Sequence, residues 1–494
     1  MRARIVFLSA LMMLGGCRTP RTPAGGGHLA LTPEEHGFSM ALAHYTLGSL
    51  YEMDLGPNAP DTIEEFELAA EYDPGRHRID SKIAVGYLLR RQPSKAIAVL
   101  EASCEYHPNE IQPRIDLAVT CQLAGRLDEA VAHFERAIDL STSESALYAS
   151  VAKIHMFRDD EDAAIATLRR GIRATASPEL LQMVSARGRH LIGKKQLNQA
   201  LRYFNLLWDE SRESVTPVLQ NLIGQLHLEL NEPQEAARAF EIASRGEEPP
   251  PETFTKLGAT LLHLGRLDEA IAALERGRAL YPRHTRLLFS LGLVCNVAHR
   301  FEEAVQAFAR IETLAAATEG TKLSEEFYVT YGSTCERTGR TLQSETLFTL
   351  CLELYPEADQ ALNYLAYIWA ESGENLEQAQ EYIDRALAIE PDNAAYLDTQ
   401  AWIHYRNGDY ASALVEMEKA MALMPEDPVL NEHMGDTHDA LDHRTEAVQF
   451  WTRSLMLDPD SSSVAWKLEA AGADLPRLRR EAQRARKRSA RHAQ

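Results

Sequence analysis

The sequence predicts an all-α solenoid built from about twelve helix–turn–helix repeats. A small residue, in most copies alanine, recurs about every 34 residues between Ala96 and Ala447. A large apolar residue follows four positions after each copy, and proline often ends the unit because its ring cannot continue a helix. A chain of 494 residues with this period grows by adding units rather than by enlarging one core.

The repeating unit is clearest at residues 254–282. Its first helix places apolar and small residues on one face at the helical period: Phe254, Leu257, Gly258 and Leu261. A turn at Gly265 separates this helix from a second one, which opens at Asp268 and stops before Pro282. The small residues let two helix axes approach to about 8–10 Å. This order of large and small residues resembles the tetratricopeptide repeat, and the resemblance implies a tetratricopeptide-repeat superhelix.

The first residues indicate a processing segment. Residues 1–16 combine two arginines with an apolar stretch that is too short to span a bilayer, which needs about 20 residues. The following Leu14-Gly15-Gly16-Cys17 resembles a bacterial lipobox, which implies a signal peptide at 1–16 and lipidation of Cys17. An ordinary secretory signal with an incidental cysteine is the alternative. Arg18, in place of the Asp that retains enterobacterial lipoproteins in the inner membrane, favours the outer membrane, facing the periplasm.

The remaining chain divides by composition. Residues 17–32 read as the lipidated cysteine and a flexible tether, because they contain proline and three consecutive glycines. An irregular repeat array is expected at 33–315 and a more regular one at 316–460. Residues 461–476 are expected to form a helix that caps the open end of the array with Val464, Trp466 and Leu468. Residues 477–494 form a basic tail, expected as a frayed helix or a disordered segment.

Charge separates the tail from the body of the protein. The formal net charge is −21, yet the tail holds eight Arg or Lys residues and one Glu. An acidic repeat array argues against nucleic acid as a partner, which requires a basic face, and favours basic or neutral partners. The tail suggests contact with anionic lipid, polyanionic cell wall or the acidic body, and a merely solubilising tail is the alternative.

Motifs for chemistry are missing from the sequence. The stretch 188–195 spells a phosphate-loop pattern but has Lys where Ser or Thr would bind Mg²⁺, and no strand precedes it. The cysteines show no metal-binding spacing and are expected to fill the core, although Cys335 and Cys351 could pair in an oxidising compartment. We therefore expect no catalytic residue, metal or cofactor, and no enzyme.

Surface residues of the late repeats are the candidate binding site. In tetratricopeptide repeats the first helix lines a concave groove, and the matching positions are expected to bind a protein or peptide partner. These positions are Asn363, Tyr367, Ala370, Asp398, Trp402, Tyr405, Glu432, Asp436 and Asp439. Tyr and Trp are typical binding hot spots, and the carboxylates would suit a basic or amide-rich peptide. Burial of Trp402 and Tyr405 between helices is the alternative.

Late motifs extend the resemblance. The segments LNYLAY at 362–367, LDTQAW at 397–402 and NEHMGD at 431–436 resemble bacterial tetratricopeptide lipoproteins. One such type binds a carboxyl-terminal processing protease and delivers substrates to it. The resemblance implies a lipid-anchored periplasmic scaffold that recruits or activates a protease. The alternatives are an outer-membrane or cell-wall assembly factor without a protease and, more remotely, an enzyme that processes a glycan or small molecule.

Overall fold

The structure is a computed structural model that describes residues 31–210, 217–317 and 322–492. The expected signal peptide, Cys17 and most of the tether lie outside the described residues. The contacts of the chain divide it into two compact units, called unit 1 and unit 2, whose boundary falls within 211–216. Each unit is described by itself below.

The described residues form 26 helices and no strands, as the sequence predicts. Unit 1 contains α2 (Pro33–Leu55), α3 (Pro60–Tyr72), α4 (His77–Leu89), α5 (Pro93–Tyr106), α6 (Ile111–Leu123), α7 (Leu127–Leu140), α8 (Ser145–Phe157), α9 (Glu161–Thr175), α10 (Pro178–Gly193) and α11 (Leu197–Glu210). Unit 2 begins with α12 (Pro217–Glu229), α13 (Pro233–Ser244), α14 (Pro251–His263), α15 (Leu267–Leu280), α16 (Thr285–Val297), α17 (Phe301–Ala316), α18 (Glu325–Arg337) and α19 (Thr341–Leu354). It continues with α20 (Asp359–Ser372), α21 (Leu376–Ile389), α22 (Ala394–Arg406), α23 (Tyr410–Leu423), α24 (Pro428–Ala440), α25 (Arg444–Leu457), α26 (Ser462–Ala470) and α27 (Leu475–His492).

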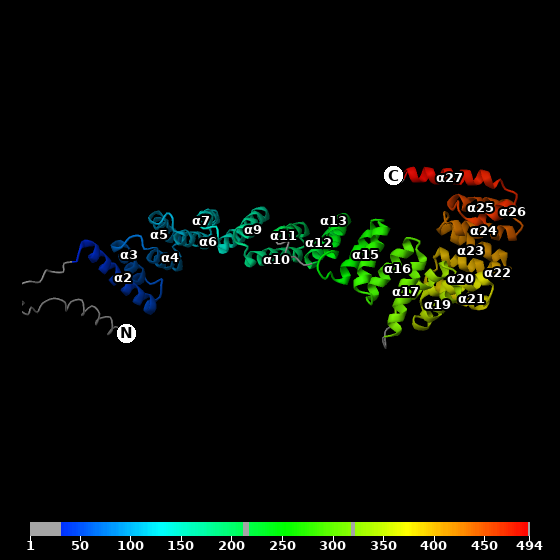
Figure 1. Ribbon diagram of the computed structural model, residues 1–494, viewed down its shortest axis with the longest axis horizontal. Coiled ribbons are helices and arrows are strands. Elements are labelled where there is room, and N and C mark those ends of the chain that lie inside the picture. Colours follow the sequence, from blue (N-terminus) through cyan, green and yellow to red (C-terminus); the bar gives the residue numbers. More distant parts are fainter. Residues whose placement is uncertain (1–30, 211–216, 318–321, 493–494) are drawn as a thin grey trace, which may run out of the picture. The chain divides into compact units, whose positions relative to one another are not determined.

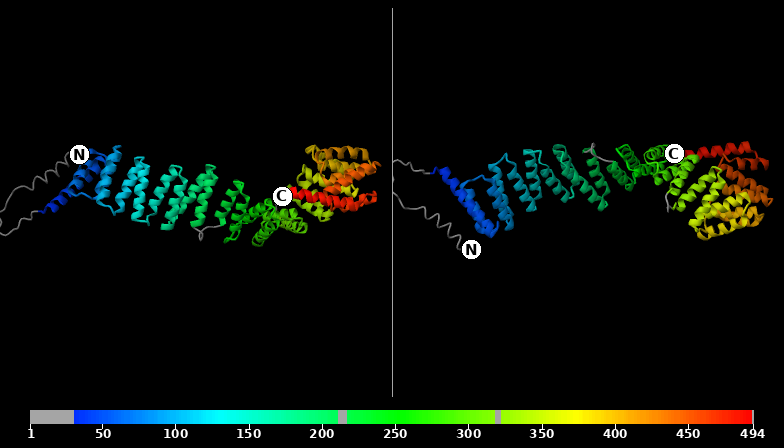
Figure 2. Two further views of the ribbon diagram at one scale, coloured as in Figure 1. Left: turned by 90° about the horizontal axis from the view of Figure 1, so that it is seen from above. Right: turned by 60° about the horizontal axis from the view of Figure 1, so that its bottom comes forward.

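Consecutive helices pack as pairs, and neighbouring pairs stack on one another within each unit (Figures 1 and 2). Unit 1 contains five pairs, from α2 with α3 to α10 with α11, and unit 2 contains seven, from α12 with α13 to α24 with α25. The twelve pairs confirm the predicted repeat architecture. Each pair hides its apolar side against its neighbours, as expected of a solenoid.

Close packing within a pair depends on the small residues of the first helix. Glycine in the first helix faces a large side chain of the second helix, as Gly292 faces Phe308 and Gly435 faces Trp451. A methyl group at Gly292 would lie only 2.4 Å from a carbon of the Phe308 ring. The alternation of small and large residues seen in the sequence therefore sets how closely the helices approach.

The turn between paired helices follows the predicted pattern. At the clearest repeat, α14 ends at His263 and α15 runs from Leu267 to Leu280, just before Pro282. Gly265 between them has a φ of +70°, a left-handed conformation that glycine adopts without strain.

Two helices follow the last pair. α26 lies in the segment where we expected a capping helix, and it buries Val464 and Leu468 completely. Trp466, which we expected to help cover the core, is instead 70% exposed. α27 is helical as far as His492 and packs on α25 through Leu475, Leu478 and the fully buried Ala482.

The described cysteines are free thiols buried in the core, so Cys335 and Cys351 do not pair. Cys121, Cys295 and Cys335 are completely buried and fill the same position of their repeats. Burial raises the pKa of each of these three thiols to about 11. None of the helices in the described ranges has the length and apolar character needed to cross a membrane.

Candidate functional site

The first helices of the late repeats in unit 2 form one continuous surface, here called the first-helix surface. α18, α20, α22 and α24 contact each other in that order. Tyr367 on α20 lies within electrostatic range of Glu336 on α18, Asp398 on α22 and Glu432 on α24. The predicted binding residues from three repeats therefore converge, as the repeat register implies.

The predicted residues differ in how far they are exposed. Asp398 and Asp436 are buried, with 7% and 8% of their surface exposed. The others, apart from the fully buried Ala370, are partly buried: Asn363, Tyr367, Trp402, Tyr405, Glu432 and Asp439. Within the described chain, the Nε1 of Trp402 and the Oδ1 of Asn363 are buried without a hydrogen-bond partner.

Asp398 forms a buried pair with a residue that the sequence reasoning missed. The Nδ1–H of His433 on α24 donates to Asp398 Oδ1 at 2.8 Å. Burial disfavours the charged imidazolium, but the charge of Asp398 and its hydrogen bond outweigh this and raise the pKa of His433 to about 9. The Trp402 ring stacks on His433 with centroids 4.4 Å apart and on Tyr405 at 4.6 Å, which favours the cationic ring.

Glu432 and Asp436 share one lysine from α26. Lys467 Nζ donates to Glu432 Oε1 and to Asp436 Oδ2, both at 2.6 Å. Burial raises the pKa of Asp436 above its usual range even though Lys467 and the indole N–H of Trp451 bond to its carboxylate. Burial acts in the same direction on Glu432, but hydrogen bonds from Lys467 and Ser463 hold its pKa below the usual value.

These pairs repeat with the solenoid. His433 and Lys467 are 34 residues apart, and so are the carboxylates to which they bind, Asp398 and Glu432. α24 and α26 thus each place a basic side chain against the carboxylate of the preceding first helix. Asp439 also has a partner, Arg444, at 2.8 Å. The four acids that we expected to attract a basic peptide therefore each contact a basic side chain within the chain, two of them sharing Lys467, and binding at these positions stays a prediction.

Other side chains of the surface are more open. Glu371 is exposed beside Tyr367, and Glu336 is partly buried without an ion pair in the described chain. Burial raises the pKa of Glu336, Arg337 opposes this, and Glu371 adds to it. Trp466 lies 34 residues after Glu432, so the exposed indole continues the register of Asp398 and Glu432. That spacing is the sequence signal that could have placed Trp466 here.

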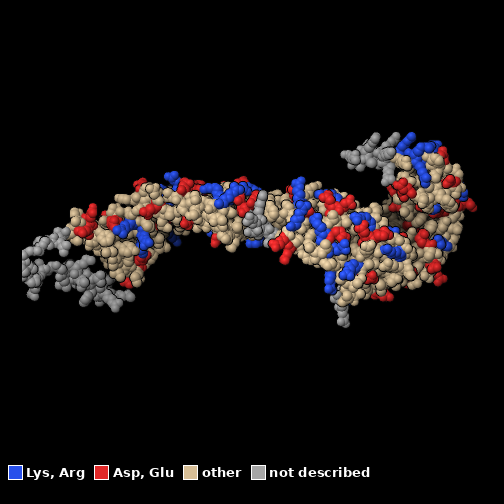
Figure 3. Space-filling view, viewed as in Figure 1, with Lys and Arg blue, Asp and Glu red and all other residues tan. Residues whose placement is uncertain are grey.

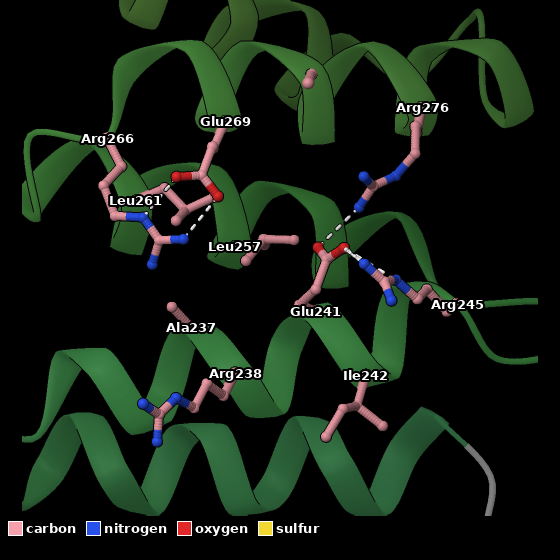
Figure 4. Close-up of a pocket in the computed structure, with 11 residues that line it drawn as sticks. Ala237, Arg238, Glu241, Ile242, Arg245, Leu257, Leu261, Arg266, Glu269 and Arg276 are labelled. Atoms are coloured by element: carbon pink, nitrogen blue, oxygen red, sulfur yellow. Dashed lines mark hydrogen bonds and ion pairs between the residues drawn. The ribbon is translucent and has the colours of Figure 1, made fainter.

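A groove lies between α13, α14 and α15, with a volume of about 610 Å³ (Figure 4). Leu257 and Leu261 line it, and arginines surround them. Arg245 and Arg276 both bind Glu241 at 2.8 Å, and Arg266 binds Glu269 at 2.6 Å. Arg238 pairs with Glu235 at 2.7 Å. The charged side chains of this groove therefore form ion pairs within the chain, and Arg276 links α15 to α13. We assign the groove a role in stacking neighbouring repeats.

In the described ranges no three His, Cys, Asp or Glu side chains gather in a way that could hold a metal ion.

Comparison with known proteins identifies the repeats. A family described as "Tetratricopeptide repeat" matches residues 221–277, 255–318, 337–394 and 372–428, and a second family of the same description matches 111–136. The repeats within these ranges are therefore tetratricopeptide repeats, and the predicted fold class is confirmed. Such repeats are protein-binding scaffolds, because stacked pairs create extended surfaces for partners.

Two curated proteins are similar over part of the chain. A TPR repeat-containing protein of Pseudomonas aeruginosa is 27% identical over 179 residues, which cover 36% of this chain and 29% of that protein. Tetratricopeptide repeat protein 8 of Caenorhabditis elegans is 24% identical over 180 residues, covering 36% and 35%. The chain thus spans about a third of the length of the curated relatives that it matches.

Solved structures are similar at low identity. The APC/C hetero-tetramer Cut9–Hcn1 aligns with 90% of this chain and 97% of its own at 12% identity, with a TM-score of 0.40. Yeast Tom70 aligns with 88% and 96% at 15% identity, with a TM-score of 0.32.

Proposed function

We propose that the protein is a lipid-anchored periplasmic scaffold that binds a protein partner on the first-helix surface of unit 2. The observation that carries this proposal is the exposed Trp466, which continues the 34-residue register of Asp398 and Glu432 beyond the group formed by Tyr367, Glu371 and Glu336. An aromatic side chain with a polar tip, such as Tyr367 beside Glu371 and Glu336, which are unpaired in the described chain, suits a partner segment that presents basic and apolar side chains.

The internal pairs give this surface a fixed shape. Asp398 and Asp436 are held by His433 and Lys467, so the carboxylates do not need to rearrange before a partner binds. A preorganised surface loses less conformational entropy on binding. We infer that the partner binds at the open positions around Tyr367 and Trp466, and that the paired acids support them.

We further propose that Cys17 carries the lipid and that the protein faces the periplasm from the outer membrane. The lipobox-like Leu14-Gly15-Gly16-Cys17 supports this, together with Arg18. Several acyl chains on one cysteine would give stable anchoring. The Cys17→Ser protein is expected to leave the membrane fraction and to lose palmitate labelling, whereas Cys351→Ser is the matched control that keeps both. Unchanged membrane partitioning of Cys17→Ser would refute the anchor.

For the partner, we propose a carboxyl-terminal processing protease of the periplasm, together with its substrates. Capture from solubilised envelope with the wild-type chain should yield a stoichiometric partner. Trp466→Ala should reduce the capture at least about tenfold, as loss of an aromatic hot spot does. Leu342→Ala, which removes a side chain that is 79% exposed on the second helix α19, is the control and should leave capture unchanged. Capture of an envelope protein other than a protease would favour the assembly-factor alternative. Equal loss of capture by Trp466→Ala and Leu342→Ala would exclude the first-helix surface as the binding site.

A further inference from the structure

The C-terminal helix α27 has two opposite faces. Leu475, Leu478 and Ala482 lie at helical spacing on one face and pack on the last apolar cluster of unit 2, to which Trp451 and Leu468 belong. This face fixes the helix against α25. The basic residues between 477 and 484 are therefore presented by a helix that has its own packing.

Basic residues occupy the opposite face. Arg477, Arg480 and Arg484 are three and four positions apart and exposed, which places them along one side of the helix. Figure 3 shows Lys and Arg gathered on this part of unit 2.

Few of these charges are neutralised within the chain. Arg477 bonds to Glu481 at 2.9 Å, and Glu481 is the single acidic residue of α27. Arg479, Arg480 and Arg484 form no ion pair within the described part of the chain. Other arginines of unit 2, such as Arg266 and Arg276, do bind carboxylates.

We propose that the basic face of α27 binds the anionic surface of a lipid bilayer. The inference rests in part on the proposed function, since the lipid anchor would keep α27 near a membrane and raise its effective concentration there. The described face consists of exposed guanidinium groups without an aromatic side chain for base stacking and without an apolar anchor for a protein hot spot. A flat anionic surface fits such a row of charges, and each basic residue near it strengthens binding about fivefold.

The test uses the full chain carrying Cys17→Ser, so that binding does not depend on lipidation. The fraction of this protein that sediments with vesicles of phosphatidylethanolamine and phosphatidylglycerol is compared with the fraction that sediments with vesicles of phosphatidylcholine alone. We expect binding to the anionic vesicles only, and its loss at high salt, because salt screens charges at exposed sites.

Charge-neutral variants locate the contact. Arg480→Gln with Arg484→Gln should weaken the vesicle partition coefficient about 25-fold, at about fivefold for each arginine. The control is Arg283→Gln with Arg286→Gln, which makes the same charge change at exposed residues away from α27 and should alter binding less than about twofold. The proposal would be overturned if the protein bound neutral and anionic vesicles equally, or if both double variants lost vesicle binding to the same extent. A clear preference for heparin or single-stranded DNA over anionic vesicles would also overturn it. None of these outcomes depends on whether Cys17 is lipidated or whether a protease is bound.

Discussion

Removing the charge of Asp398 should destabilise unit 2 in a way that depends on pH. His433 has a pKa raised to about 9 in the folded protein, against about 6.5 in the unfolded chain. A group with a raised folded pKa stabilises fully below its unfolded pKa, and this stabilisation is lost as the pH rises through the folded pKa. Asp398→Asn keeps the shape and an acceptor oxygen but removes the attraction. It should therefore lower the free energy of unfolding by up to about 3 kcal/mol at pH 6 and by much less near pH 10.

Urea unfolding followed by tryptophan fluorescence suits this measurement. Four of the five tryptophans lie in unit 2, at positions 369, 402, 451 and 466, so the signal reports mainly that unit. Asp439→Asn is the matched control, because it removes an exposed ion pair with Arg444 and should change stability by less than about 1 kcal/mol at either pH. A destabilisation by Asp398→Asn that is the same at both pH values, or larger at high pH, would refute the assignment of a charged His433.

Three further predictions concern packing, a buried ion pair and the thiols. Gly292→Ala should lower the free energy of unfolding, measured by thermal melts, by about 1–3 kcal/mol because its new methyl group would overlap the Phe308 ring. Gly193→Ala places its methyl group in open space and should be neutral or stabilising by up to about 1 kcal/mol, and equal effects of the two variants would contradict the packing described. Glu161→Gln should lower the free energy of unfolding of unit 1 by about 3–5 kcal/mol, since it leaves the nearly buried Arg187 with only the exposed Asp159, at 3.9 Å, as a counter-ion. The exposed Glu129→Gln should cost less than about 1 kcal/mol, and similar urea midpoints for the two variants would show that the Glu161–Arg187 pair is not buried. In a Cys17→Ser chain the five remaining thiols are buried and should react with a thiol reagent only after unfolding. Burial raises the pKa of Cys295 and Cys351 to about 11, and fast reaction of the native protein would contradict this burial.

Much of the fold could be predicted because repetition multiplies a weak local signal. One Gly followed by a Phe 16 residues later says little, but Gly224 with Phe240 and Gly292 with Phe308 fix the same contact twice. The tail was harder to predict. Its high charge suggested fraying or disorder, although Leu475, Leu478 and Ala482 have helical spacing and do bury that face of α27. The packing of this apolar face against α25 stabilises the helix despite the positive charge of its other face.

The candidate site was predicted as a set of positions but not as a set of interactions. The repeat register correctly brought Tyr367, Asp398 and Glu432 together. It did not reveal that Asp398 is paired, because a repeat register aligns equivalent positions and does not specify which side chain of the next repeat contacts each acid. His433 and Lys467 were visible at one 34-residue step, and so was Trp466 after Glu432. Ion pairs such as Arg276 with Glu241 depend on how long side chains reach between helices, which periodicity does not specify.

Site-specific photocrosslinking in the native envelope tests the central claim most directly. A photoreactive phenylalanine analogue is placed at Trp466 or at Tyr367 on the first-helix surface, and at the exposed Leu342 on the second helix α19 as the comparison. The account predicts one shared crosslinked protein from Trp466 and Tyr367 and none from Leu342. Crosslinks from Leu342 alone, or no crosslink from either first-helix position while the chain is folded and membrane-bound, would contradict it.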